Sequence, residues 1–179
     1  MAAKLIRLKP AGAWRIGPES GARDRVDRIY HSDTLYSAVS IAMASLGWRE
    51  EWFAATALSP DGSAARLTSL FPALGPDLLV PAPAPLWPPP NVTRLRARGA
   101  KFIPARLVAA LAAGESWKED NWEVDGLSDC LVRRGHRAEP SGPYRIALRS
   151  RAAVDRVDTG SIVVHQAACL EFAPTAGLW

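Results

Sequence analysis

The feature that most constrains the fold is a proline-rich run at residues 81–90, PAPAPLWPPP. Six of these residues are proline, which removes their backbone N–H donors and fixes φ. A helix interior and a central strand both need those donors, so the run can form neither. We predict an extended, polyproline-type connector over residues 81–93. A PxxP ligand for a partner domain is the alternative.

The clearest regular element is a helix that starts within residues 30–37, YHSDTLYS. Ser32 or Asp33 is a good N-cap, and Gly47 is a good residue to end the helix. Apolar side chains recur between these ends at helical spacing, at Leu35, Val39, Ala42 and Leu46. A second helix is predicted over residues 49–58, before the turn signal SPDG.

The remaining pattern mixes strands with one more helix, which favours an α+β fold in a single domain over residues 1–179. In residues 145–149 every second residue is apolar, so Ile146 and Leu148 are expected to face inward. The polar residues 115–142 are interpreted as an excursion from the core. Strands or extended segments are predicted at residues 4–9, 14–16, 67–71, 78–80, 145–149 and 161–172, and a helix at 104–113.

Charge is distributed unevenly along a chain whose net charge is +4. Residues 1–28 hold seven Lys and Arg against three acids, residues 94–106 five against none, and residues 133–156 seven against two. Residues 115–129 hold six acids and one base. Basic blocks separated by an acidic one suggest a surface with a polyanion-binding side. Three solvated segments without a partner are the alternative.

Several classes of site are disfavoured by the residues present. The three histidines have no helix-face metal spacing, and no HExxH, CxxC or glycine-rich phosphate motif occurs. We therefore expect neither a metal nor a cofactor. The two cysteines form no disulfide framework, no apolar run approaches the roughly 20 residues that span a bilayer, and no secretory signal opens the sequence. A cytoplasmic protein without a membrane partner is expected.

His31, Ser32 and Asp33 contain the residue types of a hydrolase triad, but consecutive residues cannot generally converge as a triad must. Capping of the helix is the simpler role for Ser32 and Asp33, and a helix N-terminus can also hold a phosphate. Asp33 would repel a phosphate, so it is expected to cap, or to accept a hydrogen bond from a base or ribose. His31 could act as acid or base in RNA cleavage.

Arginines near the C-terminus indicate a second candidate surface. Arg149, Arg151 and Arg156 flank the sequence AAVD, which ends at Asp155. Guanidinium groups bind phosphate bidentately and stack on bases, so this segment could be a basic hairpin against nucleic acid. Local ion pairs of Asp155 with Arg156 are the alternative.

The order of several motifs resembles one family. KLIRLKP, YHSDTLYSA, SLFPALGPDLLVPAPAPLWP, KFIPARL, RAAVDRVDTGS and FAPTAGLW follow one another along nearly the whole chain. Together they resemble the RAMP proteins of type III CRISPR effector complexes, and within those the Cas-five-like group of Csm-complex subunit four.

This resemblance implies a ferredoxin-like (RRM-like) domain with an antiparallel sheet, helices on one face and an inserted thumb or hairpin, placed within residues 115–160. Such proteins are non-catalytic. They cap the 5′ tag of the CRISPR RNA and contact the large polymerase-like subunit and the backbone RAMP subunit. Family members continue into a second ferredoxin-like half, so the chain is expected to be a fragment, a degenerate form, or a split subunit whose other half a second chain supplies as a further partner. The RNA-binding residues expected from motifs and charge together are His31, Ser32, Asp33, Arg15, Lys101, Arg149, Arg151, Asp155 and Arg156.

Two other functions remain open from the sequence. One is a RAMP endoribonuclease that processes precursor CRISPR RNA with His31 as acid or base. The other is an interaction module that binds only protein.

Overall fold

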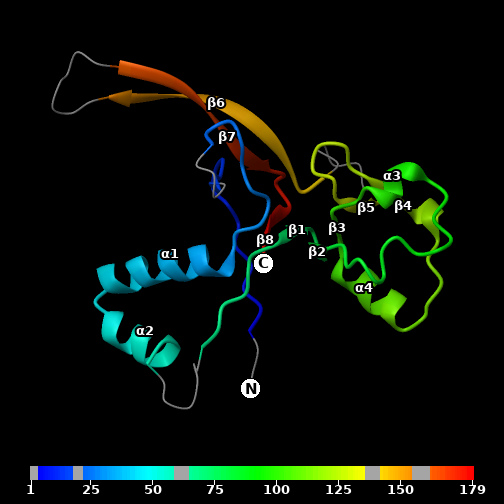
Figure 1. Ribbon diagram of the computed structural model, residues 1–179, viewed down its shortest axis with the longest axis horizontal. Coiled ribbons are helices and arrows are strands. Elements are labelled where there is room, and N and C mark those ends of the chain that lie inside the picture. Colours follow the sequence, from blue (N-terminus) through cyan, green and yellow to red (C-terminus); the bar gives the residue numbers. More distant parts are fainter. Residues whose placement is uncertain (1–3, 18–21, 59–64, 136–141, 155–161) are drawn as a thin grey trace. The chain divides into compact units, whose positions relative to one another are not determined.

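The computed structural model describes residues 4–17, 22–58, 65–135, 142–154 and 162–179. Helices and antiparallel sheets occur together, so the expected mixed α+β class is confirmed (Figure 1). Contacts divide the chain into two compact units, whereas one domain was expected. Unit 1 comprises residues 1–28 and 71–179, and unit 2 comprises residues 29–70.

Unit 2 is built on a helical hairpin of α1 (Ser32–Ser45) and α2 (Arg49–Thr56), close to the predicted ranges. Gly47 lies between them at φ 82°, a left-handed conformation that glycine adopts without strain, so its predicted role at the helix end is confirmed. The rings of Tyr36 and Trp52 pack with centroids 5.6 Å apart, and the Trp52 indole donates to Ser40 Oγ at 2.8 Å. Neither helix contains a buried residue.

The helix start differs in detail from the prediction. His31 is the N-cap of α1, and its side chain makes no capping bond. The backbone N–H of Ser32 donates instead to Ser69 Oγ at 3.1 Å, in the segment that returns beside the helix start. Asp33 Oδ1 accepts the N–H of Thr34 at 2.7 Å. The prediction of Ser32 or Asp33 as N-cap is therefore wrong, because His31 is the last residue with an extended backbone (φ −61°, ψ 147°) and Ser32 and Asp33 already belong to the helix.

Unit 1 contains a four-stranded antiparallel sheet in the order β3-β2-β1-β8. The predicted strand at 4–9 is wrong. Only Leu8 forms a bridge there, to Leu178, while Leu5 and Ile6 are exposed. The predicted strand or extended segment at 67–71 contains no regular strand, although Leu70 bridges Tyr30 and Phe71 exchanges backbone hydrogen bonds with Trp179. The strands are β1 (Pro72–Leu74), β2 (Asp77–Pro81), β3 (Phe102–Pro104) and β8 (Ala176–Leu178).

The sequence predicted an extended connector for the proline run, and this prediction is wrong. It folds into turns, in which the N–H groups of Leu86 and Trp87 donate to the carbonyl of Pro83 at 2.9 Å. These turns bury Trp87, whose ring meets Trp117 edge-on with centroids 5.3 Å apart. Burying a large aromatic side chain stabilises the folded chain more than keeping the run extended in water would. The short α3 (Leu95–Arg98) and α4 (Ala105–Ala112) cover this cluster, and α4 matches its predicted range.

Residues 115–135 differ from the expected excursion. Trp117 and Leu131 belong to the hydrophobic core, with Leu131 fully buried. Glu119 and Asp120 lie on η1 (Glu119–Asn121), and Glu123 lies on β4 (Trp122–Val124), which pairs with β5 (Leu131–Arg133). Asp125 after β4 is buried. The segment is therefore part of the folded unit 1.

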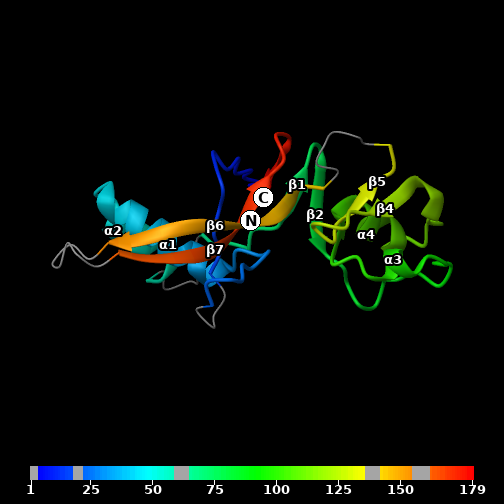
Figure 2. The ribbon, with the colours of Figure 1, turned by 90° about the horizontal axis from the view of Figure 1, so that it is seen from above.

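A long hairpin of β6 (Tyr144–Val154) and β7 (Ile162–Phe172) projects from unit 1 (Figures 1 and 2). The strands pair without interruption from Tyr144 opposite Phe172 to Val154 opposite Ile162. Gly142 precedes β6 where a Cβ would collide with the Asp125 carboxylate, so only glycine fits there. The projecting segment thus begins later than the predicted range of 115–160 and extends beyond it.

Candidate functional site

The β6–β7 hairpin has two chemically different faces. Side chains on a strand alternate, so the odd-numbered residues of β6 share one face, which carries Arg145, Arg149 and Arg151. We call these three residues the basic face. The opposite face is apolar. It carries Ile146 and Leu148 on β6, with Ile162 and Val164 on β7.

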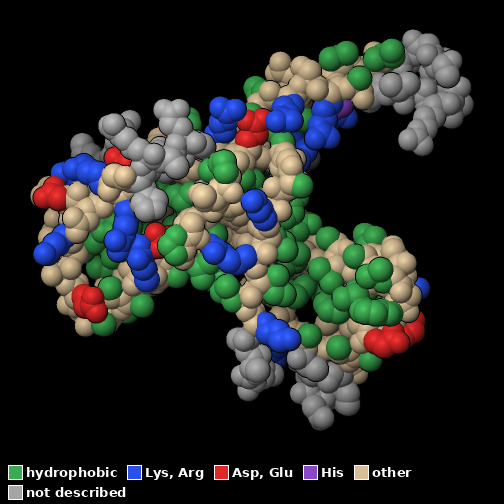
Figure 3. Space-filling view, turned by 180° about the vertical axis from the view of Figure 1, so that it is seen from behind, with side chains coloured by type: hydrophobic (Ala, Val, Ile, Leu, Met, Phe, Trp, Pro, Cys, Tyr) green, Lys and Arg blue, Asp and Glu red, His purple; other side chains and the backbone are tan. Residues whose placement is uncertain are grey.

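Both faces are open to solvent on β6 from Leu148 to Ala152 and on β7 from Ile162 to Gln166, and we call these residues the outer half of the hairpin. Leu148 is 57% exposed and Val164 is 70% exposed, while Arg151 is exposed on the other face. The prediction that Ile146 and Leu148 point into a core is wrong, because within the described residues no second layer covers this part of the ribbon. Lys and Arg side chains follow one another along the hairpin in Figure 3.

One acid lies among the arginines of the basic face. Glu171 on β7 accepts from Arg145 Nε and from Arg149 Nε, each at 2.9 Å. The Arg149 and Arg145 guanidinium groups hold the pKa of the Glu171 carboxyl below its ordinary value. The single negative charge of Glu171 neutralises one of its two arginine partners, so the basic face keeps a net positive charge. The shared carboxylate also holds these two arginines side by side.

Arg15, an expected RNA contact, is used inside the protein. Its guanidinium donates to the carbonyls of Ala22 at 3.0 Å, Arg23 at 2.8 Å and Ala168 at 3.0 Å. Ala168 lies on β7, and its N–H donates to the carbonyl of Arg23 at 2.8 Å. Arg15 therefore fastens the segment that starts at Ala22 to the edge of the hairpin.

This fastening brings two arginines to the hairpin that sequence reasoning did not single out. Arg23 and Arg25 are exposed, and Arg15 also binds the backbone carbonyls of both. Arg145 was also missed, although it shares the alternation of Arg149 and Arg151. The signal for Arg23 and Arg25 was the basic block in residues 1–28, but sequence alone could not say which of its members stay free.

Lys101 lies in a structural ion cluster rather than on the hairpin. Asp129 accepts from Arg28 at 2.6 Å, and Lys101 Nζ lies 3.3 Å from the same carboxylate. The Arg28 hydrogen bond is the main cause that lowers the pKa of Asp129. Asp129 has φ 56°, a conformation that aspartate tolerates better than most residues. Lys101 is still largely exposed, so one side of its ammonium remains open.

His31, Ser32 and Asp33 lie together at the start of α1 in unit 2, apart in sequence and in folding unit from the hairpin of unit 1. His31 is exposed, and in the described ranges no side chain hydrogen-bonds its imidazole. The Ser32 and Thr34 amides at this helix start are already bound by Ser69 and Asp33, and the trio lacks the convergent partners of a triad among the described residues. Asp155 and Arg156 lie outside the described residues.

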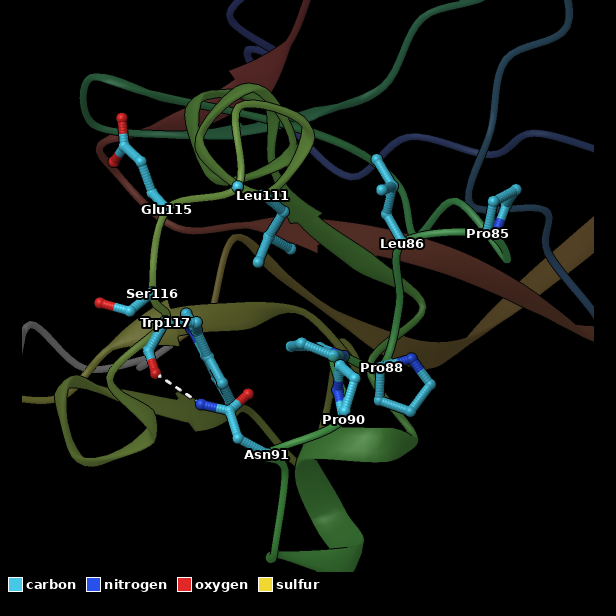
Figure 4. Close-up of a pocket in the computed structure, with 11 residues that line it drawn as sticks. Pro85, Leu86, Pro88, Pro90, Asn91, Leu111, Glu115, Ser116 and Trp117 are labelled. Carbon is cyan, nitrogen blue, oxygen red and sulfur yellow. Dashed lines mark hydrogen bonds between the residues drawn. The ribbon is translucent and has the colours of Figure 1, made fainter.

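A cavity of about 460 Å³ lies in unit 1 beside the proline turns (Figure 4). Pro85, Pro88 and Leu86 form one wall and Leu111 another, and Asn91 Nδ2 donates to the Trp117 carbonyl at 3.0 Å. Among the described residues that line this cavity, Glu115 is the titratable one. An acid–base pair or a nucleophile with its base is not assembled there.

The cysteines and the metal-ligating residue types also form no reactive site among the described residues. Cys130 and Cys169 are buried free thiols, and burial raises the pKa of Cys130 to about 12. A thiol of that kind is a poor nucleophile at neutral pH. No metal-binding group of His, Cys, Asp and Glu occurs within the described ranges. Among those same residues, no helix has the length and apolar character needed to cross a membrane.

Comparison with protein-family models gives no match for this chain, and comparison with curated proteins gives none either.

Proposed function

We propose that this chain is a non-catalytic RNA-binding subunit that holds RNA through the basic face of its β6–β7 hairpin. The observation that carries the proposal is an outer hairpin that is exposed on both faces and bears Arg149 and Arg151 on one of them. An isolated two-stranded ribbon gains little stability from its own pairing. Arginines held along such a ribbon offer planar donors that suit phosphate oxygens.

The segment that Arg15 fastens beside β7 extends this surface. Arg23 and Arg25 add two exposed guanidinium groups next to the hairpin edge. A surface made of arginines without an ordered set of base-reading side chains favours binding through phosphates and shape, with little sequence preference.

The more specific part of the proposal depends on the sequence motifs. By their resemblance to type III CRISPR RAMP proteins, the RNA is CRISPR RNA, whose 5′ tag the chain caps. The chain then joins the large polymerase-like subunit to the backbone filament. A ferredoxin-like topology belongs to this same proposal. The alternative RAMP endoribonuclease would need a second group to assist His31, and no observation on the described residues favours it.

A binding and cleavage assay with purified protein tests the proposal. We expect labelled RNA that carries a CRISPR 5′ tag to be retained intact, with or without EDTA. Retention should fall when Arg23 and Arg25 are both changed to Glu, and His31→Ala should leave it unchanged. Metal-independent cleavage lost in His31→Ala would instead support the endoribonuclease. Absence of RNA binding, both alone and with neighbouring subunits present, would contradict the proposal and leave a protein-only module.

A further inference from the structure

A second surface, in unit 2, has a chemistry opposite to that of the hairpin. A cavity of about 360 Å³ opens between α1 and α2, and we call it the Trp48 pocket. Its walls are Met43 from α1 and Trp48, Glu51, Trp52 and Ala55 from the connection and α2. Hydrophobic side chains gather on this unit beside an acidic patch, as Figure 3 shows.

The floor of the Trp48 pocket is fixed. The Trp52 indole donates to Ser40 Oγ at 2.8 Å, and its ring packs against Tyr36. Tyr36 in turn shares a hydrogen bond of 3.0 Å with Thr56 Oγ1. A wall that is already held in place does not need to be ordered when a ligand binds, which lowers the entropic cost of association.

The rim of the Trp48 pocket is apolar and unusually open. Trp48 is 60% exposed, and Leu46 just before it is 66% exposed. Tryptophan and methionine are among the side chains enriched in protein interfaces, and tryptophan is frequent among the few residues that provide most of the binding energy. A cavity of this volume can take one large apolar side chain.

The charge at the rim selects the kind of partner. Glu51 lines the Trp48 pocket and Glu50 precedes it, and neither carboxylate has an ion-pair partner within the described part of unit 2. The neighbouring Arg49 lies over the Phe53 ring at 5.7 Å. Unpaired carboxylates repel phosphate, so RNA is a poor occupant, whereas a Lys or Arg beside the apolar anchor would be attracted to Glu51 and to the Trp48 ring.

We propose that the Trp48 pocket is a docking site for a partner protein, which inserts a bulky apolar side chain flanked by Lys or Arg. This site acts independently of RNA, so it does not depend on the proposed function of the hairpin. The chain then has two binding surfaces of opposite charge, one for a polyanion and one for a basic, apolar protein segment.

Two labelled model peptides test this inference by fluorescence anisotropy without RNA. One is an amphipathic helix of leucine and lysine, and the other is its match in leucine and glutamate. The full chain should bind the lysine peptide at least about tenfold more tightly. Trp48→Ala should reduce that binding about tenfold, and Glu51→Lys should reverse the preference between the two peptides.

Glu123→Lys, the same charge reversal on exposed β4 of unit 1, is the matched control and should change nothing. Equal affinity for both peptides, or equal effects of Glu51→Lys and Glu123→Lys, would overturn the inference. Self-association of the chain that Trp48→Ala abolishes would also overturn it, because a second copy would then be the occupant. Arg149→Glu should leave peptide binding intact, which separates this result from any failure of RNA binding.

Discussion

The base and the outer half of the β6–β7 hairpin belong to the same two strands, yet they have different surroundings. At the base, Tyr144 and Leu170 are fully buried, and Tyr144 donates its hydroxyl proton to the Ser128 carbonyl at 3.1 Å. In the outer half, Leu148 and Val164 are exposed although they continue the same alternation. The base therefore anchors the hairpin in unit 1, and the outer half is free to bind.

This difference teaches that alternation identifies the faces of a strand but does not show whether a face is covered. A row of apolar side chains without a second layer contributes little to folding. An exposed row of apolar side chains is instead typical of a surface that binds a partner. Substitutions at the base should thus change stability, and substitutions in the outer half should change binding.

The largest effect on stability is expected from Tyr144→Ala at the base. The substitution empties a fully buried site and removes the edge contact with Phe172, so the free energy of unfolding should fall by roughly 3–5 kcal/mol. Tyr144→Phe, which loses only the hydrogen bond, should cost about 1 kcal/mol. Urea denaturation followed by circular dichroism measures both. A small effect of Tyr144→Ala would mean that the base is not an anchor.

Arg15→Lys should have the next largest effect. Lysine keeps the charge but cannot reach the carbonyls of Ala22, Arg23 and Ala168 at once, so we expect a loss of about 2 kcal/mol. The same denaturation experiment checks this value. An unchanged stability would show that the segment beside β7 does not need its guanidinium clamp.

Asp129→Asn should destabilise the chain by about 1 kcal/mol at neutral pH, because the ion cluster is partly solvated. The pKa of the folded carboxyl is lowered, chiefly by Arg28. Its stabilisation is therefore complete above the unfolded pKa of about 3.9 and is lost as the pH falls through the lower folded value. Asparagine tolerates the same positive φ, so charge alone is tested. A wild-type advantage that persists in strong acid would contradict this assignment.

The smallest effect on stability is expected from Ile162→Ser in the outer half. Ile162 is 63% exposed, so the free energy of unfolding should change by less than about 0.5 kcal/mol. A thermal melt beside that of Leu170→Ala, a base residue of the same hairpin, provides the contrast. A loss at Ile162 as large as at Leu170 would show that the apolar face is covered within the chain.

The sequence predicted the elements that depend on local signals. The helix α1 was expected from apolar spacing and from Gly47, α2 from the turn signal that follows it, and α4 and β7 were also expected close to their observed ranges. These signals lie within a few residues of the elements that they specify.

The misplaced elements depend on distant contacts. Trp87 draws the proline run into turns because Trp117 lies in the core beside it. Ser69 Oγ accepts the backbone N–H of Ser32, and Leu178 is the bridge partner of Leu8.

The candidate site also depends on contacts between residues that are distant in sequence. Charge pointed to Arg15, Arg149 and Arg151 alike, but only the fold shows that Arg15 binds carbonyls, while Arg149 pairs with Glu171 at the surface and Arg151 faces solvent.

The salt dependence of RNA binding tests most directly whether the outer hairpin is the RNA-binding arm. Affinity for tag-bearing RNA should fall steeply with salt, because each neutralised phosphate releases counterions. Arg149→Glu with Arg151→Glu should weaken binding roughly ten- to a hundredfold and flatten the logarithmic slope by about 1.4. Lys118→Glu with Arg134→Glu, two exposed residues beside β4 and β5, should leave both values unchanged. Equal losses in the two double variants, or binding that ignores salt, would contradict the account.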